Sequence, residues 1–239
     1  MDKSKKVLII IPAYNEGDNI EKVVDNLISN FPQYDYIIVN DGSTDRTKQI
    51  CRERGYAILN LPINMGIGGA VQTGYRYARD NDYDIAVQID GDGQHDVGFL
   101  EDMIRCMEEE QADCVIGSRF VEKEGFQSSG LRRIGIRFLS VLGWILTGVR
   151  LKDITSGYRL VNRRFIRIFA EDYPSDYPEP EAMVITAVYG GKIREYPVVM
   201  REREGGISSI TLKKSIYYMV KVTIAMLIRR LSFGVRRQK

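Results

Sequence analysis

Short apolar runs alternate with amphipathic segments along the first half of the chain, and this alternation restricts the fold more than any other feature. The run Val7–Ile11 is continuous and β-branched, which is typical of a strand covered on both faces. Similar runs occupy residues 36–39, 57–61, 85–89 and 114–117, and helical patterns lie between them at residues 18–30, 47–54, 70–80 and 97–109. Since strands that alternate with helices pair in parallel, we predict an α/β fold with a doubly wound, mostly parallel sheet and helices on both faces.

The composition excludes several classes of protein. The 239 residues are 44% hydrophobic and 28% charged, which fits a globular chain and not collagen, low-complexity disorder or a polytopic membrane protein. Three scattered cysteines favour a reducing compartment over a disulfide framework. The first residues, Met1–Lys6, lead into only seven apolar residues, so we expect no signal peptide or anchor there and a cytoplasmic location.

The net charge of +2 conceals an asymmetry along the chain. From Gly205 onward there are eight Lys or Arg and no acid, which leaves 26 bases against 32 acids in the rest. An acidic body with a basic tail differs from a nucleic-acid binder, whose positive charge lines a broad face. We therefore expect no nucleic-acid partner.

Three predicted strands end in loops that carry acids: Glu16, Asp41, and the pair Asp90 and Asp92. One such loop alone is more often a turn, because Asp and Gly favour turns. In open parallel sheets, however, ligands bind beyond the carboxyl ends of the strands. Three acidic loops at that edge favour a binding site.

The segment Asp90-Gly91-Asp92 is the most informative of these loops. Two carboxylates one residue apart repel each other unless a cation lies beside them. Oxygen ligands favour Mg²⁺ or Mn²⁺, and Gln94 and His95 follow at positions from which a third ligand can reach the metal. The alternative interpretation is an acidic surface turn.

The glycine-rich loop at residues 66–69 is not a dinucleotide fingerprint, because Gly74 arrives too late and inside a helix. It is not a P-loop either, since no Lys-Ser or Lys-Thr pair follows it. The helix that begins at about Ala70 can still direct its amino end at a ribose or phosphate.

The ends of the predicted strands together carry four motifs that resemble one family. They are Ile11–Glu16, Val39–Asp45, Asn64–Gly69 followed by Ala70 and Gly74, and Asp90–His95. In this order they resemble the inverting nucleotide-sugar glycosyltransferases of family two, which have the GT-A fold. Later segments look like its polyprenyl-phosphate branch, which includes dolichyl-phosphate mannose synthases and undecaprenyl-phosphate sugar transferases. These segments are Gly117–Phe120, Leu131–Arg133 with Arg137, Asp153–Arg159, Glu181, Glu195–Pro197, and Arg203 with Gly206 and Ser208.

The resemblance implies roles for individual residues. The nucleotide sugar is bound by Pro12, Ala13, Tyr14, Glu16, Asp41, Gly69, Asp90, Gly91, Asp92 and Arg203, the first five at the base and ribose. A Mg²⁺ or Mn²⁺ cofactor is held by Asp90, Asp92 and Gln94. The catalytic set is Asp90, Asp92, Arg119 and Asp153, with Arg119 facing phosphate and Asp153 first in a structural or orienting role. The acceptor contacts are Arg133, Arg137, Ser156, Arg159 and Glu181.

The implied reaction is metal-dependent, inverting transfer of a hexose from a nucleotide diphosphate sugar to a polyprenyl phosphate on the cytoplasmic face of a membrane. A UDP-sugar is the favoured donor and GDP-mannose the second. Two alternatives stay open. One is transfer to a saccharide hydroxyl in cell-wall or surface-polysaccharide synthesis, and the other is an inactive nucleotide-sugar-binding scaffold.

The last part of the chain is predicted to be a basic amphipathic helix over residues 212–239, attached to a catalytic domain of residues 1–211. Its apolar and basic residues suit the surface of an anionic membrane leaflet. The apolar stretch at residues 138–149 is too short to span a bilayer. A core-facing helix is the alternative, and a membrane-protein partner or self-association through this helix is a further hypothesis.

Overall fold

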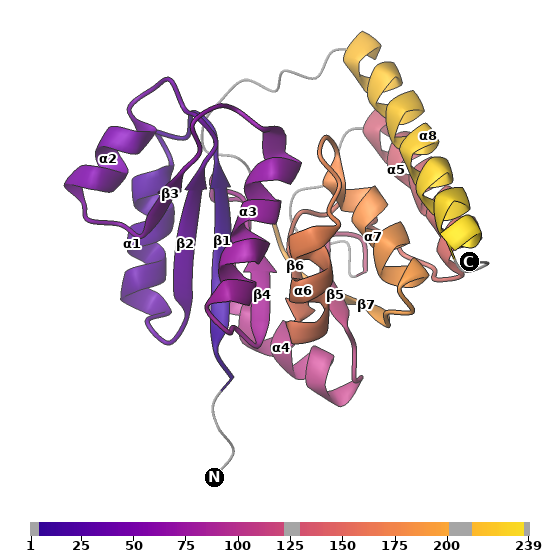
Figure 1. The fold of residues 1–239 in the computed structure, drawn as a ribbon, viewed down its shortest axis with the longest axis horizontal. Helices are drawn as coiled ribbons and strands as arrows, with labels where there is room; N and C mark the ends of the chain where they lie inside the picture. Colours follow the sequence, from indigo (N-terminus) through magenta and orange to yellow (C-terminus); the bar gives the residue numbers. More distant parts are fainter. Residues whose placement is uncertain (1–4, 122–129, 201–211, 237–239) are drawn as a thin grey trace.

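The computed structural model describes residues 5–121, 130–200 and 212–236. Its centre is a seven-stranded sheet with the order β3-β2-β1-β4-β6-β5-β7 (Figure 1). The strands are β1 (Val7–Ala13), β2 (Asp35–Asn40), β3 (Ile58–Asn60), β4 (Ile85–Gln88), β5 (Cys114–Ser118), β6 (Arg159–Asn162) and β7 (Ile193–Pro197). The predicted α/β class is confirmed.

One strand, β6, runs against the others. It pairs antiparallel with both β4 and β5, whereas every other pair in the sheet is parallel. The start of β6 therefore lies at the edge where its neighbours end. No pattern in the sequence predicted this reversal.

Helices cover both faces of the sheet, as predicted. They are α1 (Ile20–Asn30), α2 (Thr47–Glu53), α3 (Gly66–Asp80), the short η1 (Val97–Phe99), α4 (Leu100–Glu109), α5 (Gly130–Thr147), α6 (Arg163–Glu171), α7 (Pro178–Val188) and α8 (Leu212–Arg236). Strand β1 alternates between two cores: Leu8 and Ile10 pack on the side of α3 and α6, and Ile9 and Ile11 on the side of α1 and α4. Burial on both faces explains why this strand is apolar throughout.

Helix α3 begins at Gly66, four residues earlier than the predicted start. The glycines of the predicted loop form its first turn. Gly68 donates its N–H to the Ser175 carbonyl at 3.0 Å, and a Cβ at this position would lie 2.0 Å from the Pro174 carbonyl oxygen. A glycine is needed here because the segment after α6 crosses the helix start.

Helix α8 lies beside α5 and α7, at the side of the molecule away from β3 (Figure 1). Val222 and Met226 are buried in this contact, and the Met219 sulfur would be 3.2 Å from a Cβ at Gly135. The boundary between the two predicted domains falls at residues 201–211, outside the described residues, so that division stays a prediction.

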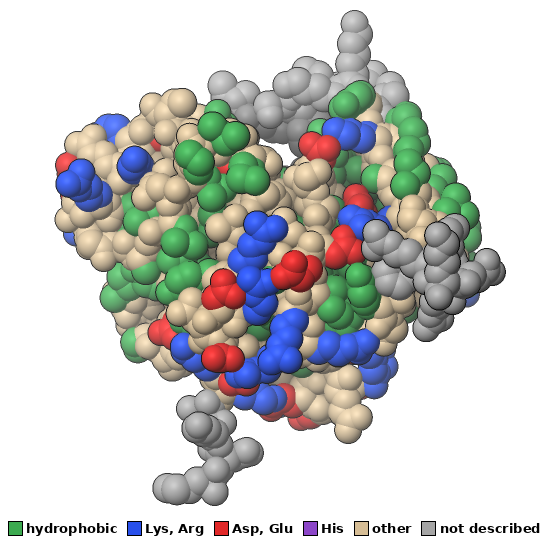
Figure 2. All heavy atoms as spheres, viewed as in Figure 1, with side chains coloured by type: hydrophobic (Ala, Val, Ile, Leu, Met, Phe, Trp, Pro, Cys, Tyr) green, Lys and Arg blue, Asp and Glu red, His purple; other side chains and the backbone are tan. Residues whose placement is uncertain are grey.

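Both α5 and α8 expose apolar side chains on their outer sides, and Figure 2 shows them along α8. The exposed residues, here named the α5–α8 apolar face, are Phe138, Val141, Trp144, Ile145, Tyr217, Val220, Ile224, Leu227, Ile228 and Leu231. Among the described residues, none of the helices combines the length and the hydropathy that crossing a membrane requires.

Candidate active site

The strand order reverses at β1, because the chain continues to β2 and β3 on one side of it and returns as β4 on the other. In open α/β sheets ligands bind at such a switch point, beyond the carboxyl ends of the strands. The loops after β1, β2 and β4 meet at this edge. They contain the three predicted acidic segments.

Asn15 joins the loops after β1 and β2. Its backbone adopts a left-handed φ of 58°, a conformation that Asn tolerates better than most residues. Its side-chain oxygen accepts the N–H groups of Thr44 (2.9 Å) and Asp45 (3.3 Å), and its own N–H donates to Ser43 Oγ at 3.0 Å. Asn15 was not among the predicted site residues, although its place directly after a buried strand was a usable signal.

Asp45 adds a second connection between these loops. Its carboxylate accepts the N–H groups of Gly17 (3.0 Å) and Thr47 (2.9 Å). Thr47 Oγ1 in turn accepts the N–H of Glu16 at 2.9 Å. Partial burial raises the pKa of Asp45, but these hydrogen bonds outweigh it and the pKa lies below its ordinary value. The carboxylate therefore acts as a structural acceptor.

Asp41 lies at the end of β2 and is only 3% exposed. Its N–H donates to the Ala13 carbonyl at 2.9 Å, and its Oδ1 accepts the Met65 N–H at 2.6 Å. It thus ties the ends of β1 and β2 to the start of α3, whose first turn includes Gly69. The other predicted base-side residues differ in burial: Pro12 and Ala13 are buried in β1, and Tyr14 is 48% exposed.

The segment Asp90-Gly91-Asp92 follows β4 and lies against the end of β1. A Cβ at Gly91 would be 3.3 Å from the Pro12 carbonyl oxygen and 3.5 Å from Glu16 Cγ, so a side chain here would crowd the edge of the site. Asp90 and Asp92 are both partly exposed. Asp92 Oδ1 accepts the N–H of Gln94 at 3.1 Å, which closes this loop on itself.

The residues present at this loop fit a hard divalent cation. Within the described ranges, no group of three or more His, Cys, Asp or Glu side chains gathers as a complete metal cage. Magnesium-like ions seldom use such cages, and typically bind one or two carboxylates together with substrate phosphates. Two partly exposed carboxylates at a switch point match that pattern.

The reversed strand β6 brings a distant loop to the same carboxylates. A Cβ at Gly157 would lie 3.2 Å from Asp90 Oδ1 and 3.3 Å from Oδ2. This loop, at residues 153–158, lies beside the β4 loop because β6 starts where β4 ends. Segments about sixty residues apart are thus joined in one site.

Arg119 and Asp153 form a buried pair in this region. The Arg119 guanidinium donates through Nε (2.6 Å) and Nη2 (2.7 Å) to the two Asp153 oxygens, and the Asp153 side chain is 0% exposed. Burial lowers the pKa of Arg119, but the Asp153 carboxylate outweighs it and raises the pKa overall. The Asp153 N–H in turn donates to Glu195 Oε1 on β7 at 2.7 Å.

Two predicted acceptor residues are buried below this surface. Arg159 is 1% exposed and donates to the carbonyls of Ser156 (2.8 Å) and Glu179 (3.3 Å). Arg159 Nε and Ser156 Oγ are buried without a hydrogen-bond partner in the described part of the chain, as is Gln88 Nε2 on the adjacent strand. Arg159 supports the site from within the sheet.

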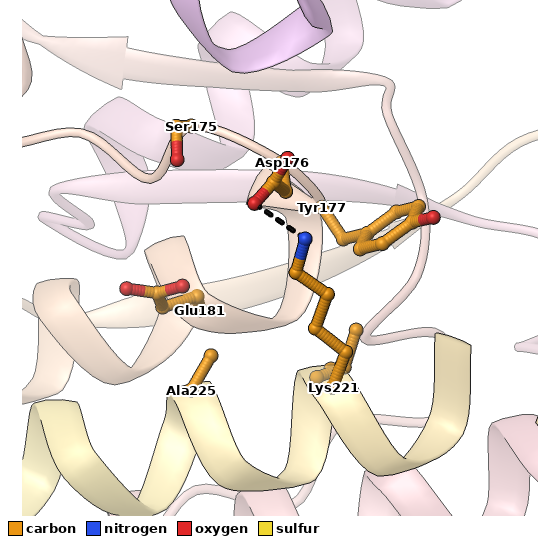
Figure 3. A pocket seen from close by; sticks show the side chains of 7 residues that line it. Ser175, Asp176, Tyr177, Glu181, Lys221 and Ala225 are labelled. Carbon is orange, nitrogen blue, oxygen red and sulfur yellow. Dashed lines mark ion pairs between the residues drawn. The ribbon is translucent and has the colours of Figure 1, made fainter. Parts of the chain in front are cut away.

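The remaining predicted acceptor residues lie on helices. Glu181 on α7 accepts Arg229 Nε of α8 at 2.9 Å. It also lines a small pocket between α7 and α8, where Lys221 and Asp176 form an ion pair at 2.8 Å (Figure 3). On α5, Arg133 is half-buried and Arg137 is exposed, and Arg203 lies outside the described residues.

Comparison with known sequences identifies a family. A family model described as "Glycosyl transferase family 2" matches residues 8–169. A UDP-N-acetylglucosamine–dolichyl-phosphate N-acetylglucosaminyltransferase of Methanococcus voltae is 30% identical over 217 residues, covering 81% of this chain and 85% of that protein. An undecaprenyl-phosphate mannosyltransferase of Micrococcus luteus is 31% identical over 215 residues, covering 86% of this chain and 88% of that protein.

Solved structures share the fold at lower identity. Glucosyl-3-phosphoglycerate synthase from Mycobacterium tuberculosis, in complex with Mn²⁺, UDP and glucosyl-3-phosphoglycerate, superposes with a TM-score of 0.68 and 20% identity. The match covers 95% of this chain and 80% of that one. At this identity the likeness shows the fold alone.

Proposed function

This chain belongs to glycosyl transferase family 2, and we propose that it transfers a hexose, with inversion, from a nucleotide diphosphate sugar to a polyprenyl phosphate at the cytoplasmic face of a membrane. The relatives named for dolichyl and undecaprenyl phosphates support this acceptor class. A UDP-sugar is the first donor, supported by the UDP-sugar of the archaeal relative and by the UDP in the mycobacterial structure, and GDP-mannose is the second. The observation that carries the proposal is the meeting of the β1, β2 and β4 loops at the switch point of the sheet.

The donor's base and ribose are assigned to the edge formed by β1, β2 and the start of α3. Asp41 is held there by hydrogen bonds to both neighbouring segments. Tyr14, the first residue after β1, is exposed, and its aromatic ring is available for stacking on a base. Asn15 and Asp45 position this edge without being assigned to the ligand.

The diphosphate is assigned to the β4 loop. Asp90 and Asp92, with Gln94, would hold a divalent cation, and Mn²⁺ is supported by the mycobacterial structure. Such a cation, when bound, neutralises the charge that develops on the departing nucleotide. Arg119 adds a fixed positive charge at the same edge, held in place by Asp153.

The acceptor step needs no carboxylate base in this proposal. A phosphate oxygen forms the bond to the anomeric carbon while the bond to the diphosphate breaks, and the nucleoside diphosphate leaves. The acceptor phosphate is already ionised at neutral pH, since its second pKa is about 6. Asp153 is fully buried and engaged by Arg119, so its role is positioning.

The α5–α8 apolar face is proposed to rest on the membrane surface that carries the acceptor. Its exposed residues recur at helical spacing. The Arg150 guanidinium carbon lies over the Trp144 ring, 4.3 Å from the ring centroid. Tryptophan and arginine are both suited to the headgroup region. The eight basic residues after Gly205 match the charge of anionic lipid.

The proposal is tested by supplying the full chain with labelled UDP-glucose, UDP-N-acetylglucosamine or GDP-mannose, Mn²⁺ and three acceptors. The acceptors are a short polyprenyl phosphate, an oligosaccharide and 3-phosphoglycerate. We expect label in the lipid product alone, lost on chelation of the metal. Label in the oligosaccharide would support the saccharide alternative, and donor binding without any transfer would support the scaffold.

A matched pair of variants tests the metal assignment in the same assay. Asp92→Asn removes a carboxylate at the carboxyl end of β4 and is expected to lower turnover at least about 100-fold. Asp84→Asn changes an acid just before the amino end of the same strand, where it accepts the Lys6 N–H at 3.0 Å, and is expected to leave turnover unchanged. Equal turnover in both variants would remove the carboxylate pair from the mechanism.

A further inference from the structure

His95 lies at the end of the β4 loop with its side chain only 3% exposed. Its ring stacks on Tyr158, with the ring centroids 5.1 Å apart and the planes at 21°. The Tyr158 hydroxyl donates to the Asp96 carbonyl at 3.2 Å. The imidazole is therefore held in one plane by its neighbours.

Both ring nitrogens of His95 face Asp90. The Asp90 N–H donates to Nδ1 at 3.0 Å, and Nε2 lies 3.6 Å from Asp90 Oδ2. Since Nδ1 accepts a hydrogen bond, the proton of the neutral ring is on Nε2, on the side of the carboxylate.

The Asp90 carboxylate is confined on a second side by Gly157. A Cβ there would lie within 3.3 Å of both carboxylate oxygens. The imidazole and the Gly157 backbone together limit the rotation of this side chain. The ring of His95 thus holds the backbone of Asp90 by a hydrogen bond and lies beside its carboxylate.

We propose that His95 is a positioning residue: it fixes the backbone of Asp90 by a hydrogen bond and, together with Gly157, confines the Asp90 carboxylate to the orientation that binds the donor's divalent cation. This inference rests on the proposed function for the cation itself. Groups that orient a metal ligand typically change metal affinity 10- to 100-fold when they are removed. A histidine that only filled the core would affect folding stability and leave metal affinity unchanged.

Three substitutions separate these roles. His95→Phe keeps a ring for stacking on Tyr158 and removes both nitrogens. His95→Asn keeps an acceptor near the position of Nδ1, and His95→Gln extends its amide beyond it. We expect Mn²⁺ affinity of the full chain, measured by electron paramagnetic resonance with UDP present, to fall about 10- to 100-fold in His95→Phe. His95→Asn should restore most of it, and His95→Gln less.

Thermal unfolding of each variant reports the packing role separately. Wild-type Mn²⁺ affinity in His95→Phe would overturn the inference while leaving the carboxylate assignment intact. If His95→Phe does not fold, equal losses of affinity in His95→Asn and His95→Gln would overturn it instead. Failure of the wild-type chain to bind Mn²⁺ with UDP present would overturn the proposed metal role, and this inference with it.

Discussion

At the scale of single residues, the Arg119–Asp153 pair fixes a positive charge beside the candidate metal carboxylates. Its two parallel hydrogen bonds of 2.6 and 2.7 Å use the planar geometry of guanidinium and carboxylate. Asp153 is buried completely, and Arg119 is its charged partner. Changing either residue removes the charged partner of the other.

Asp153→Asn is expected to destabilise the protein by about 3 kcal/mol, because removing one partner of a buried ion pair leaves an uncompensated charge. Transfer activity should fall as well, since Arg119 loses its fixed orientation. Chemical denaturation of the variant measures the free energy of unfolding. Asp176→Asn is the matched control: its pair with Lys221 is 59% and 37% exposed, and the expected cost is below about 1 kcal/mol. Equal costs for both variants would contradict the account.

At the scale of secondary-structure elements, local pattern was enough to predict the first half of the sheet. Runs such as Val7–Ile11 are buried on both faces, so they are apolar throughout. They can be recognised as strands without knowing which strands they pair with. The position of β6 between β4 and β5 depends on pairing with strands far away in sequence, and no local period encodes it. The early start of α3 has the same cause, because Gly68 is contacted by the segment after α6.

The site residues also fall into those that local pattern could place and those whose contacts depend on distant elements. The acidic loops after β1, β2 and β4 could be placed at one edge, because parallel strands end together. The contacts of Glu181 with Arg229 and of Asp153 with Arg119 required the packing of distant elements. Motif spacing assigned Glu181 to the acceptor, which stays a prediction, and the structure adds a contact of Glu181 with Arg229 between α7 and α8.

Strand β7 supports the loop before β6 through Glu195, and this contact predicts a pH dependence. Burial raises the pKa of Glu195 above its ordinary value of 4.5. The pKa of Glu195 is therefore higher in the folded protein than in the unfolded chain. The carboxyl group stabilises the folded state fully below pH 4.5, and this stabilisation is lost as the pH rises through the folded-state pKa. The stability of wild type relative to Glu195→Gln should therefore decline as the pH rises from 4.5. Urea unfolding at a series of pH values measures this, and a constant or rising difference would contradict it.

Helix α8 is attached to the catalytic body by Arg229, which pairs with Asp172 at 2.6 Å and with Glu181 at 2.9 Å. Arg229→Met should lower the free energy of unfolding by about 1–2 kcal/mol and increase hydrogen exchange along α8. Arg230→Met, next in sequence and exposed, is the control and should change neither quantity. Identical exchange in the two variants would show that the ion pairs do not hold the helix.

At the scale of the whole molecule, two surfaces have separate chemistry. The carboxyl edge of the sheet gathers carboxylates and Arg119, and the α5–α8 apolar face exposes large side chains such as Ile145 and Leu231, each 70% exposed. A transferase with a lipid-linked acceptor needs both surfaces, one for the polar donor and one for the membrane. Because α8 is attached to α7, both surfaces belong to the same folded unit.

The apolar face predicts binding to anionic vesicles. Ile224→Glu combined with Leu231→Glu adds charge to exposed positions of α8, and should abolish flotation with phosphatidylglycerol vesicles without lowering the melting temperature. Ile28→Glu, on α1, replaces a residue that is 48% exposed and should float like wild type. Flotation of the double variant at the wild-type level would exclude this face as the membrane contact.

In the proposed mechanism, Asp90 and Asp92 hold the cation that neutralises the departing nucleotide. The most direct test is a crystal structure of the full chain with Mn²⁺ and UDP, in which anomalous scattering locates the metal. We predict the Mn²⁺ peak bound to carboxylate oxygens of Asp90 and Asp92 and to the UDP diphosphate, at the carboxyl ends of β1 and β4. A metal peak elsewhere, or UDP seated away from the β4 loop, would contradict the account.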